Sequence, residues 1–300
     1  MKIYCTDRFV LPLPAGHRFP MAKYAMLRER VQSAGLAGSE ALCVPDAASD
    51  QELLRAHDAD YLARVLEGRL TPAEIRRIGF PWTPEMVERS RRSSGATIAA
   101  CRAALAEGVA VNLAGGTHHA FRDHGAGYCV FNDSAVAALA MRAEGLARRL
   151  VVIDCDVHQG DGTAAILAHD PSVFSFSIHA RKNFPFRKEV SDLDIELADG
   201  TGDDDYLAAL EQGLCHALSA AQPDLAIYLA GADPYQDDRL GRLALTGKGL
   251  ELRDRMVLQY CRDAGVPVAI AMAGGYARRI EDGVDIHFAT VRAAADFHRR

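Results

Sequence analysis

The chain has 300 residues, of which 49% are hydrophobic and 25% are charged, and its 34 Lys+Arg against 40 Asp+Glu give a formal net charge of −6. This balance is typical of a soluble globular protein and excludes a disordered chain, and the lack of about 18 uninterrupted apolar residues excludes a transmembrane helix. The net acidity, without a long run of lysine and arginine, argues against a dedicated nucleic-acid binder.

The cysteines indicate a reducing compartment. There are seven of them, an odd number, and none belongs to a CxxC pair. A secreted disulfide scaffold typically has an even number at closer spacing. The segment from Met1 to Cys5 also lacks the apolar core of a signal peptide. We therefore expect free thiols in a cytoplasmic protein.

In chain order, an irregular first part is followed by regular alternation of strands and helices. The first 80 residues are rich in proline and contain two short predicted helices, Ala22–Ala34 and Asp58–Leu66. Continuous apolar runs then predict strands that are covered on both faces. These runs are Val109–Leu113, Leu150–Ile153, Val173–Ile178, Leu225–Ala230 and Val266–Met272.

Segments of helical composition lie around these strands. They are Met86–Glu107, Ser134–Arg148, Asp204–Ala221 and Lys248–Ala264. Pro84 is a favourable start for the first, and we expect Asp203 and Thr246 to cap the last two. The alternation predicts an α/β fold with one open parallel sheet and helices on both faces. Since no stretch resembles a linker, we expect residues 1–300 to form a single domain.

Chemically active residues follow each predicted strand, at the edge where open parallel sheets bind ligands. A metal site is indicated by Asp154-x-Asp156-x-His158, because alternate residues of an extended chain point the same way. Asp233, at another strand end, would complete an Asp/His/Asp set. Three protein ligands with an open position are typical of catalytic zinc, although iron and manganese also suit oxygen-rich sites. The alternative is a solvated strand end with Asp161 as a helix cap.

Two further motifs fit hydrolytic chemistry beside such a metal. His118 and His119 directly follow Gly115-Gly116 and could serve as general base and general acid. They would need carboxylates to fix their tautomers, and Asp154 and Asp161 remain for that task. The Gly274-Gly275-Tyr276 turn could aim a phenol at a developing oxyanion.

These blocks, in this order, resemble the histone deacetylase superfamily of the arginase/deacetylase fold. The resemblance covers about Val109 to Tyr276 and runs through GGTHHA, GYCVFND, VIDCDVHQGDGT, SFSIH, GADPY and AGGYA. The stretches His17–Tyr24 and Arg77–Trp82 are most similar to the class IV branch and its bacterial relatives. The resemblance implies a single deacetylase-like catalytic domain built on a sheet of about eight strands.

The resemblance also implies roles for individual residues. One zinc ion per chain would be held by Asp156, His158 and Asp233. The proton would be handled by His118 and His119, with Asp154 and Asp161 behind them, and Tyr276 would polarise the acyl carbonyl. The substrate would contact Gly127, Tyr128, Phe184 and Gly274. A structural potassium ion would be held by the side chains of Asp154 and Ser177 and by backbone carbonyls near Asp156, His158 and Ile178.

The chain departs from the family pattern at two positions near the predicted site. Thr117 stands where many relatives have an aromatic residue, and Ala273 replaces one glycine before Tyr276. The resemblance implies a zinc-dependent deacylase acting on acetyl-lysine or longer acyl-lysine in proteins, with no direct nucleic-acid or membrane partner. Acetylpolyamines and other small acyl amides are alternative substrates.

Two other functions compete with this one. An arginase-like dimanganese hydrolase needs further bridging carboxylates, whereas Pro234 and Tyr235 follow Asp233. A non-catalytic module that binds acylated ligands would be expected to lack the tyrosine, a histidine or a ligand, and all of these are present.

Overall fold

The computed structural model describes residues 1–36 and 41–298 and contains one sheet of eight strands in the order β2-β1-β3-β8-β7-β4-β5-β6. Each pair of neighbouring strands runs parallel. The strands are β1 (Ile3–Tyr4), β2 (Leu42–Cys43), β3 (Val109–Asn112), β4 (Leu150–Asp154), β5 (Val173–Ala180), β6 (Leu193–Leu197), β7 (Leu225–Leu229) and β8 (Val268–Ala271). The predicted open parallel sheet is confirmed.

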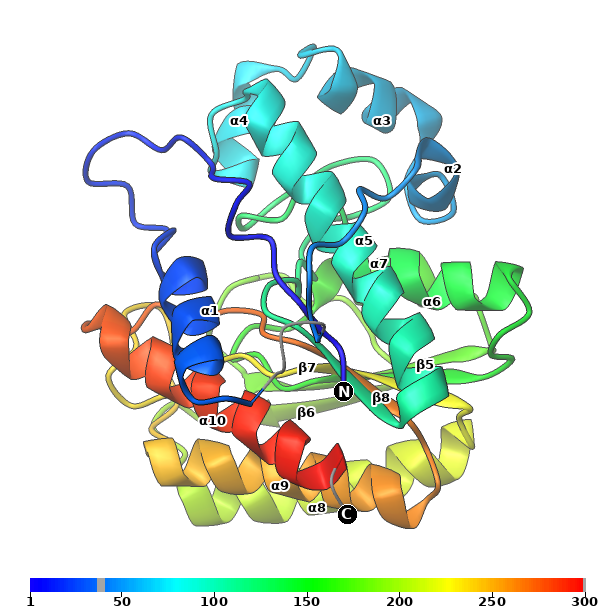
Figure 1. Ribbon diagram of the computed structural model, residues 1–300, viewed down its shortest axis with the longest axis vertical. Helices are drawn as coiled ribbons and strands as arrows, with labels where there is room; N and C mark the ends of the chain where they lie inside the picture. Colours follow the sequence, from blue (N-terminus) through cyan, green and yellow to red (C-terminus); the bar gives the residue numbers. More distant parts are fainter. Residues whose placement is uncertain (37–40, 299–300) are drawn as a thin grey trace.

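Helices cover both faces of this sheet, as predicted (Figure 1). They are α1 (Lys23–Ser33), α2 (Asp50–Leu53), α3 (Ala59–Leu66), α4 (Pro72–Ile78), α5 (Pro84–Glu107), α6 (Asp133–Ala143), α7 (Asp161–Leu167), α8 (Asp203–Ala221), α9 (Gly247–Asp263) and α10 (Ile280–His298). One face is covered by α1, α8, α9 and α10, and the other by α5, α6 and α7.

Strand β4 shows why its apolar run is continuous rather than alternating. Val151 and Ile153 belong to the core on the side of α8 and α9, whereas Leu150 and Val152 belong to the core on the side of α5 and α6. All four side chains are at most 1% exposed. A strand buried on both faces gains by placing an apolar side chain at every position, and β4 therefore sits rigidly in the middle of the fold.

The predicted elements differ from the observed ones mainly at their ends. The helix expected over Ser134–Arg148 ends at Ala143, because Gly145 takes a left-handed φ of 70° that turns the chain away. Strands β1, β2 and β6 were not predicted from the sequence. Strands β1 and β2 have only two residues each, and the edge strand β6 is only partly buried, so none of them contains a long continuous apolar run. Among the helices, α2, α4, α7 and α10 were also not predicted.

One of the two expected helix caps is confirmed and the other is wrong. Thr246 caps α9, because its hydroxyl accepts a 3.0 Å hydrogen bond from the amide of Gly249. Asp203 is instead the first residue of α8 and caps nothing. Its carboxylate accepts hydrogen bonds from the amide and hydroxyl of Thr246 at 2.8 and 2.7 Å. Asp203 therefore joins the starts of α8 and α9.

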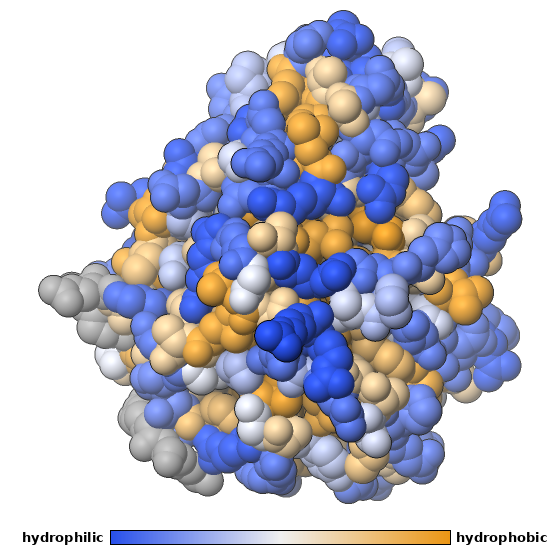
Figure 2. Space-filling model, turned by 90° about the vertical axis from the view of Figure 1, so that its right-hand side faces the viewer, coloured by the Kyte–Doolittle hydropathy of each residue, from blue (hydrophilic) through white to orange (hydrophobic). Residues whose placement is uncertain are grey.

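The surface is polar over most of the face drawn in Figure 2, with hydrophobic residues appearing between the hydrophilic ones. Within the described part of the chain, no helix combines the length and the apolar character needed to cross a bilayer. All seven cysteines are free, as the sequence predicts.

Replacing Thr246 with alanine should lower the free energy of unfolding by about 1 kcal/mol, because the amide of Gly249 loses its partner. The measurement is urea unfolding followed by circular dichroism. Ser219→Ala, on the exposed side of α8, is the matched control and should change stability by less than about 0.5 kcal/mol. Equal stability of the two variants would contradict a capping role for Thr246.

Candidate active site

The candidate site lies at the carboxyl ends of four strands that are neighbours in the sheet. These strands are β3, β8, β7 and β4, in that order across the sheet. The histidine pair follows β3, Asp156 and His158 follow β4, Asp233 follows β7 and Tyr276 follows β8. Parallel neighbours place their carboxyl ends at one edge. Residues that are up to 158 positions apart in sequence (118 to 276) therefore meet there.

Asp156, His158 and Asp233 form a buried cluster whose possible ligand atoms lie within 4.8 Å of one another. The Nδ1 atom of His158 is 2.8 Å from Asp156 Oδ1 and 3.4 Å from Asp233 Oδ2. The Oδ2 atom of Asp233 is buried and has no hydrogen-bond partner among the described residues. Burial and the nearby Asp156 raise the pKa of Asp233 to about 6. A divalent cation would satisfy this orphaned oxygen and offset the crowded carboxylates, so the donor set fits a metal.

The expectation that Asp154, Asp156 and His158 share one face of an extended strand is wrong. Strand β4 ends at Asp154, and bends follow it. The carboxylate of Asp154 accepts a 3.1 Å hydrogen bond from the amide of Asp156, and Asp156 accepts a 3.0 Å bond from the amide of His158. Aspartates fold the chain back on itself in this way. As a result Asp154 faces the histidines, and only Asp156 and His158 face the metal cluster.

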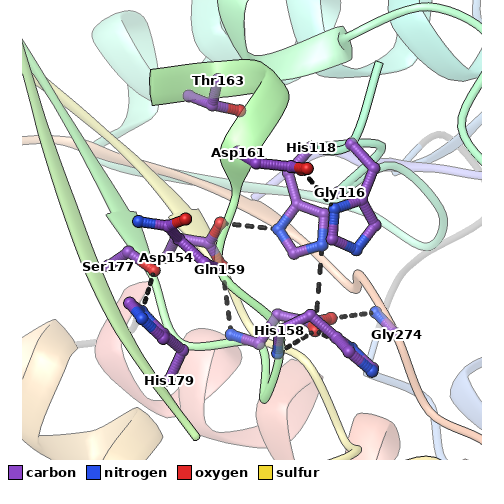
Figure 3. A network of polar contacts seen from close by, with 12 residues as sticks. Gly116, His118, Asp154, His158, Gln159, Asp161, Thr163, Ser177, His179 and Gly274 are labelled. Atoms are coloured by element: carbon purple, nitrogen blue, oxygen red, sulfur yellow. Dashed lines mark hydrogen bonds and ion pairs between the residues drawn. The ribbon is translucent and has the colours of Figure 1, made fainter. Parts of the chain in front are cut away.

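Each of the two adjacent histidines is backed by its own aspartate. His118 Nδ1 lies 2.7 Å from Asp154 Oδ2 (Figure 3). His119 Nδ1 lies 2.6 Å from Asp161 Oδ1. The ring centres are 4.1 Å apart. These contacts leave the Nε2 atoms of both rings free to face the cavity, with His118 Nε2 3.8 Å from Asp156 Oδ1.

The surroundings drive the two histidine pKa values apart. Burial alone would lower the pKa of His118, but the charges of Asp154 and Asp156 outweigh burial and raise it to about 9. Burial and the charge of His118 lower the pKa of His119 to about 4. At neutral pH the pair therefore offers one protonated and one neutral imidazole, the division of labour that acid–base chemistry requires.

A buried polar network that the sequence analysis missed holds the histidine loop in place. Asp133 accepts hydrogen bonds from the amides of Gly116 and Thr117 at 3.0 and 2.7 Å, and from the Thr117 hydroxyl at 2.7 Å. Asn132 caps α6 and donates from Nδ2 to the carbonyl of His118 at 3.3 Å. The signal was an Asn-Asp pair before an alanine-rich helix. Thr117 thus helps to hold the histidine loop through polar contacts.

A second missed residue supports the metal cluster from behind. Arg253 of α9 is 0% exposed and donates to the carbonyls of Gly231 and Cys155 at 2.5 and 3.3 Å. Gly231 lies two positions before Asp233, and Cys155 lies one position before Asp156. Asp254 balances the buried guanidinium at 2.8 Å. Nothing in the sequence of this helix indicated that the side chain of Arg253 would be buried.

The turn after β8 closes the site from the other side. The amide of Gly274 donates to Asp156 Oδ2 at 2.9 Å, and a β-carbon at this position would overlap the Oδ2 atoms of both Asp156 and Asp233. Ala273 takes a left-handed φ of 53°, a conformation that favours glycine. The amide of Tyr276 donates to Asp238 at 2.6 Å. Burial and Asp233 hold the pKa of the Tyr276 phenol well above its usual value, so it stays a proton donor.

A cavity of about 430 Å³ leads to this cluster, and all four residues predicted to contact substrate line it. They are Gly127, Tyr128, Phe184 and Gly274. The Phe184 ring centre is 4.9 Å from that of His119, and the Tyr128 ring centre is 5.9 Å from that of Tyr276. Aromatic walls over polar groups at the base suit a substrate with an apolar arm that ends in a polar group.

The proposed potassium ligands lie beneath the site. Asp154 pairs with Ser177 in the β4–β5 register, and the Ser177 hydroxyl lies 2.9 Å from Nδ1 of His179 (Figure 3). Asp154 already contacts His118 and the amide of Asp156. The potassium site, with the carbonyls of Asp156, His158 and Ile178, stays a prediction.

Comparisons with known proteins agree with this geometry. The histone deacetylase domain family matches residues 17–291. An uncharacterized protein from Picosynechococcus sp. is 45% identical over 296 residues, which is 99% of this chain and 98% of that protein. The histone deacetylase-like amidohydrolase of Pseudomonas aeruginosa is 32% identical over 88% of this chain and 74% of its own length. The crystal structure of a histone deacetylase homologue from Aquifex aeolicus shares the fold, with a TM-score of 0.86 at 24% identity, over 98% of this chain and 84% of that chain.

Replacing Gly274 with alanine should weaken Zn²⁺ binding at least about tenfold, because the added methyl displaces two carboxylate oxygens of the cluster. The measurement is a competition titration with a chromophoric chelator. Gly247→Ala is the matched control, since a β-carbon there meets nothing within 4 Å, and it should bind Zn²⁺ like the parent protein. If both variants bind Zn²⁺ with equal affinity, the turn after β8 does not contribute to metal binding.

Acidification should destabilise the fold through His57, which is 1% exposed. Its Nδ1 faces the carbonyl of Phe121 and its Nε2 accepts from the amide of Asn132, both at 2.9 Å, so the ring is neutral. Burial lowers its pKa from 6.5 to about 4. The unfolded chain therefore binds the extra proton first, and stability that is complete above pH 6.5 falls by up to about 3 kcal/mol as the pH drops toward 4.

The measurement is the free energy of unfolding from pH 7 to pH 4.5 in the parent protein and in His57→Gln. The glutamine variant should have a shallower dependence on pH over this range, because it has no imidazole to protonate. His124→Gln, at a partly exposed position, should retain the parent slope. Identical slopes in all three proteins would exclude His57 as the source.

Proposed function

This chain belongs to the histone deacetylase family, and from that premise we propose that it is a zinc-dependent deacylase that hydrolyses the amide of acyl-lysine side chains in proteins. The observation that carries the proposal is the buried cluster of Asp156, His158 and Asp233 at the base of an aromatic cavity, beside two histidines that each have an aspartate partner. We further propose that residues 1–300 act as one catalytic domain. From the similarity of His17–Tyr24 to class IV members, we propose that the chain is related to the class IV branch of the family.

In this proposal Asp156, His158 and Asp233 would hold one zinc ion. When bound, zinc polarises the acyl carbonyl and lowers the pKa of a nearby water. Within residues 1–36 and 41–298, this is the only group of three or more His, Cys, Asp or Glu side chains that lie close enough together to hold a metal ion. That observation favours a single catalytic ion over the two ions of an arginase-like hydrolase. A structural potassium ion held by Asp154, Ser177 and neighbouring carbonyls is part of the same proposal.

The two histidines divide the proton transfers according to their surroundings. His119, neutral and oriented by Asp161, takes the proton from the attacking water. His118, charged and oriented by Asp154, stabilises the negative charge of the tetrahedral state and delivers a proton to the leaving amine. The phenol of Tyr276 donates a hydrogen bond to the oxyanion, which forms only as the reaction proceeds.

The proposal is tested directly by hydrolysis of fluorogenic acyl-lysine peptides with acyl chains of increasing length, alongside acetylpolyamines. We expect turnover of at least one acyl-lysine peptide, loss of turnover after treatment with a chelator and inhibition by a hydroxamate. Ligand binding without turnover would indicate a non-catalytic module, and exclusive turnover of acetylpolyamines would replace lysine as the substrate.

Replacing Tyr276 with phenylalanine should reduce kcat by about 10²–10³-fold, because one oxyanion donor is lost while the metal ligands are untouched. The measurement combines steady-state kinetics with zinc content by atomic absorption. Tyr235→Phe, a tyrosine outside the residues that line the cavity, is the control and should retain activity. A Tyr276→Phe protein with near-normal kcat would exclude the phenol from catalysis.

A further inference from the structure

The mouth of the cavity is lined by positive charge. Four basic residues contribute, and we call them the basic mouth. They are Arg76, Arg77, Lys182 and Arg242. Among the described residues that line the cavity, the only carboxylates are those of Asp156 and Asp233, which belong to the metal cluster at its base. All four basic side chains are exposed to solvent.

The basic mouth is assembled from three separate segments that the fold fixes around the tunnel. The end of α4 is bonded to Gly127 and Tyr128, which line the cavity. The carbonyls of Arg77 and Ile78 accept hydrogen bonds from the amides of these two residues at 3.1 and 2.7 Å. The loop after β5, which carries Lys182, is tied to the loop after β7 by a 2.6 Å bond from Asn183 Nδ2 to the carbonyl of Leu240. Arg242 follows two residues later. The positive charges are therefore held beside the opening.

Most of this charge has no ion-pair partner among the described residues. Arg76, Arg77 and Lys182 form no ion pair with any described residue, and Arg242 has one partner, Asp199, at 3.2 Å. Lys188, in the same loop as Lys182, differs from these residues. Its ammonium group donates hydrogen bonds to the carbonyls of Asn183 and Pro185 at 2.7 and 2.6 Å. The local excess also runs against the chain as a whole, whose formal net charge is −6.

We propose that the basic mouth selects acyl-lysines that lie among acidic residues of a peptide, and that it disfavours cationic amines. This inference rests on the proposed deacylase function. With the acyl-lysine arm in the cavity, the neighbouring peptide residues lie at the opening, within the Debye length of about 8 Å at physiological salt. Acidic side chains there are attracted by the exposed guanidinium and ammonium groups, and a protonated polyamine chain is repelled. The 85% exposed ring of Phe186, also at the mouth, offers apolar contact to such a peptide.

The test uses three acetyl-lysine peptides of equal length whose flanking residues are acidic, neutral or basic. At low salt, we expect kcat/KM to be about tenfold higher for the acidic peptide than for the basic one, as for several weak exposed charge pairs acting together. The difference should shrink as salt is added. Binding of the same peptides, labelled for fluorescence anisotropy, is measured in parallel with the zinc-loaded protein.

The double variant Arg76→Glu, Lys182→Glu should abolish the preference for the acidic peptide, because the two new carboxylates offset the remaining charges of Arg77 and Arg242. Arg148→Glu is the matched control: Arg148 is exposed just before the amino end of β4, at the opposite edge of the sheet, and the parent preference should persist. Equal kcat/KM for the three peptides overturns the inferred preference and leaves the deacylase function standing. If no peptide is hydrolysed but the acidic peptide binds more tightly than the basic one, the deacylase function is overturned and the preference for acidic peptides is supported. If no peptide is hydrolysed and all three bind equally, both the deacylase function and the preference are overturned.

Discussion

Two aspartates and a histidine buried within a few ångströms of one another are the constraint on which the rest of the structure depends. Removing carboxylates from water is costly unless charge or hydrogen bonds compensate. Here the backbone supplies part of the compensation, through the amides of Val157 and Gly274. The Oδ2 atom of Asp233 has no hydrogen-bond partner among the described residues, and a divalent cation would satisfy it.

The scaffold around the cluster is built to hold these groups at fixed positions. Four adjacent strands bring the ligands to one edge, and the buried side chains of Arg253 and Asp133 fix the loops that follow those strands. A glycine at position 274 lets the chain pass close to two carboxylates. Arg253 and Asp133 are not among the described residues that line the cavity, yet they help to determine where the reactive atoms lie.

The interior and the mouth of the cavity have different electrostatic tasks. The interior separates the pKa values of two neighbouring imidazoles by placing a different set of charges around each of them. The mouth carries the exposed positive charges of the basic mouth, which we propose act on the substrate before the chemistry begins. In the proposed function, charge at the base of the cavity would govern the reaction, and charge at the opening would govern which acylated amines reach it.

The sequence by itself determined the parallel sheet, the family and the identity of the residues that gather at its edge. Continuous apolar runs reveal doubly covered strands, and Asp154–His158, Asp233 and Tyr276 stand directly after such runs. Tertiary structure decided what local pattern cannot express. Asp154 turned toward His118 because the strand ends there, Asp203 joined two helices instead of capping one, and Arg253 proved to be buried. The basic mouth likewise exists only in the folded chain, because its charges come from three segments that are far apart in the sequence and are each held beside the cavity by hydrogen bonds to other loops.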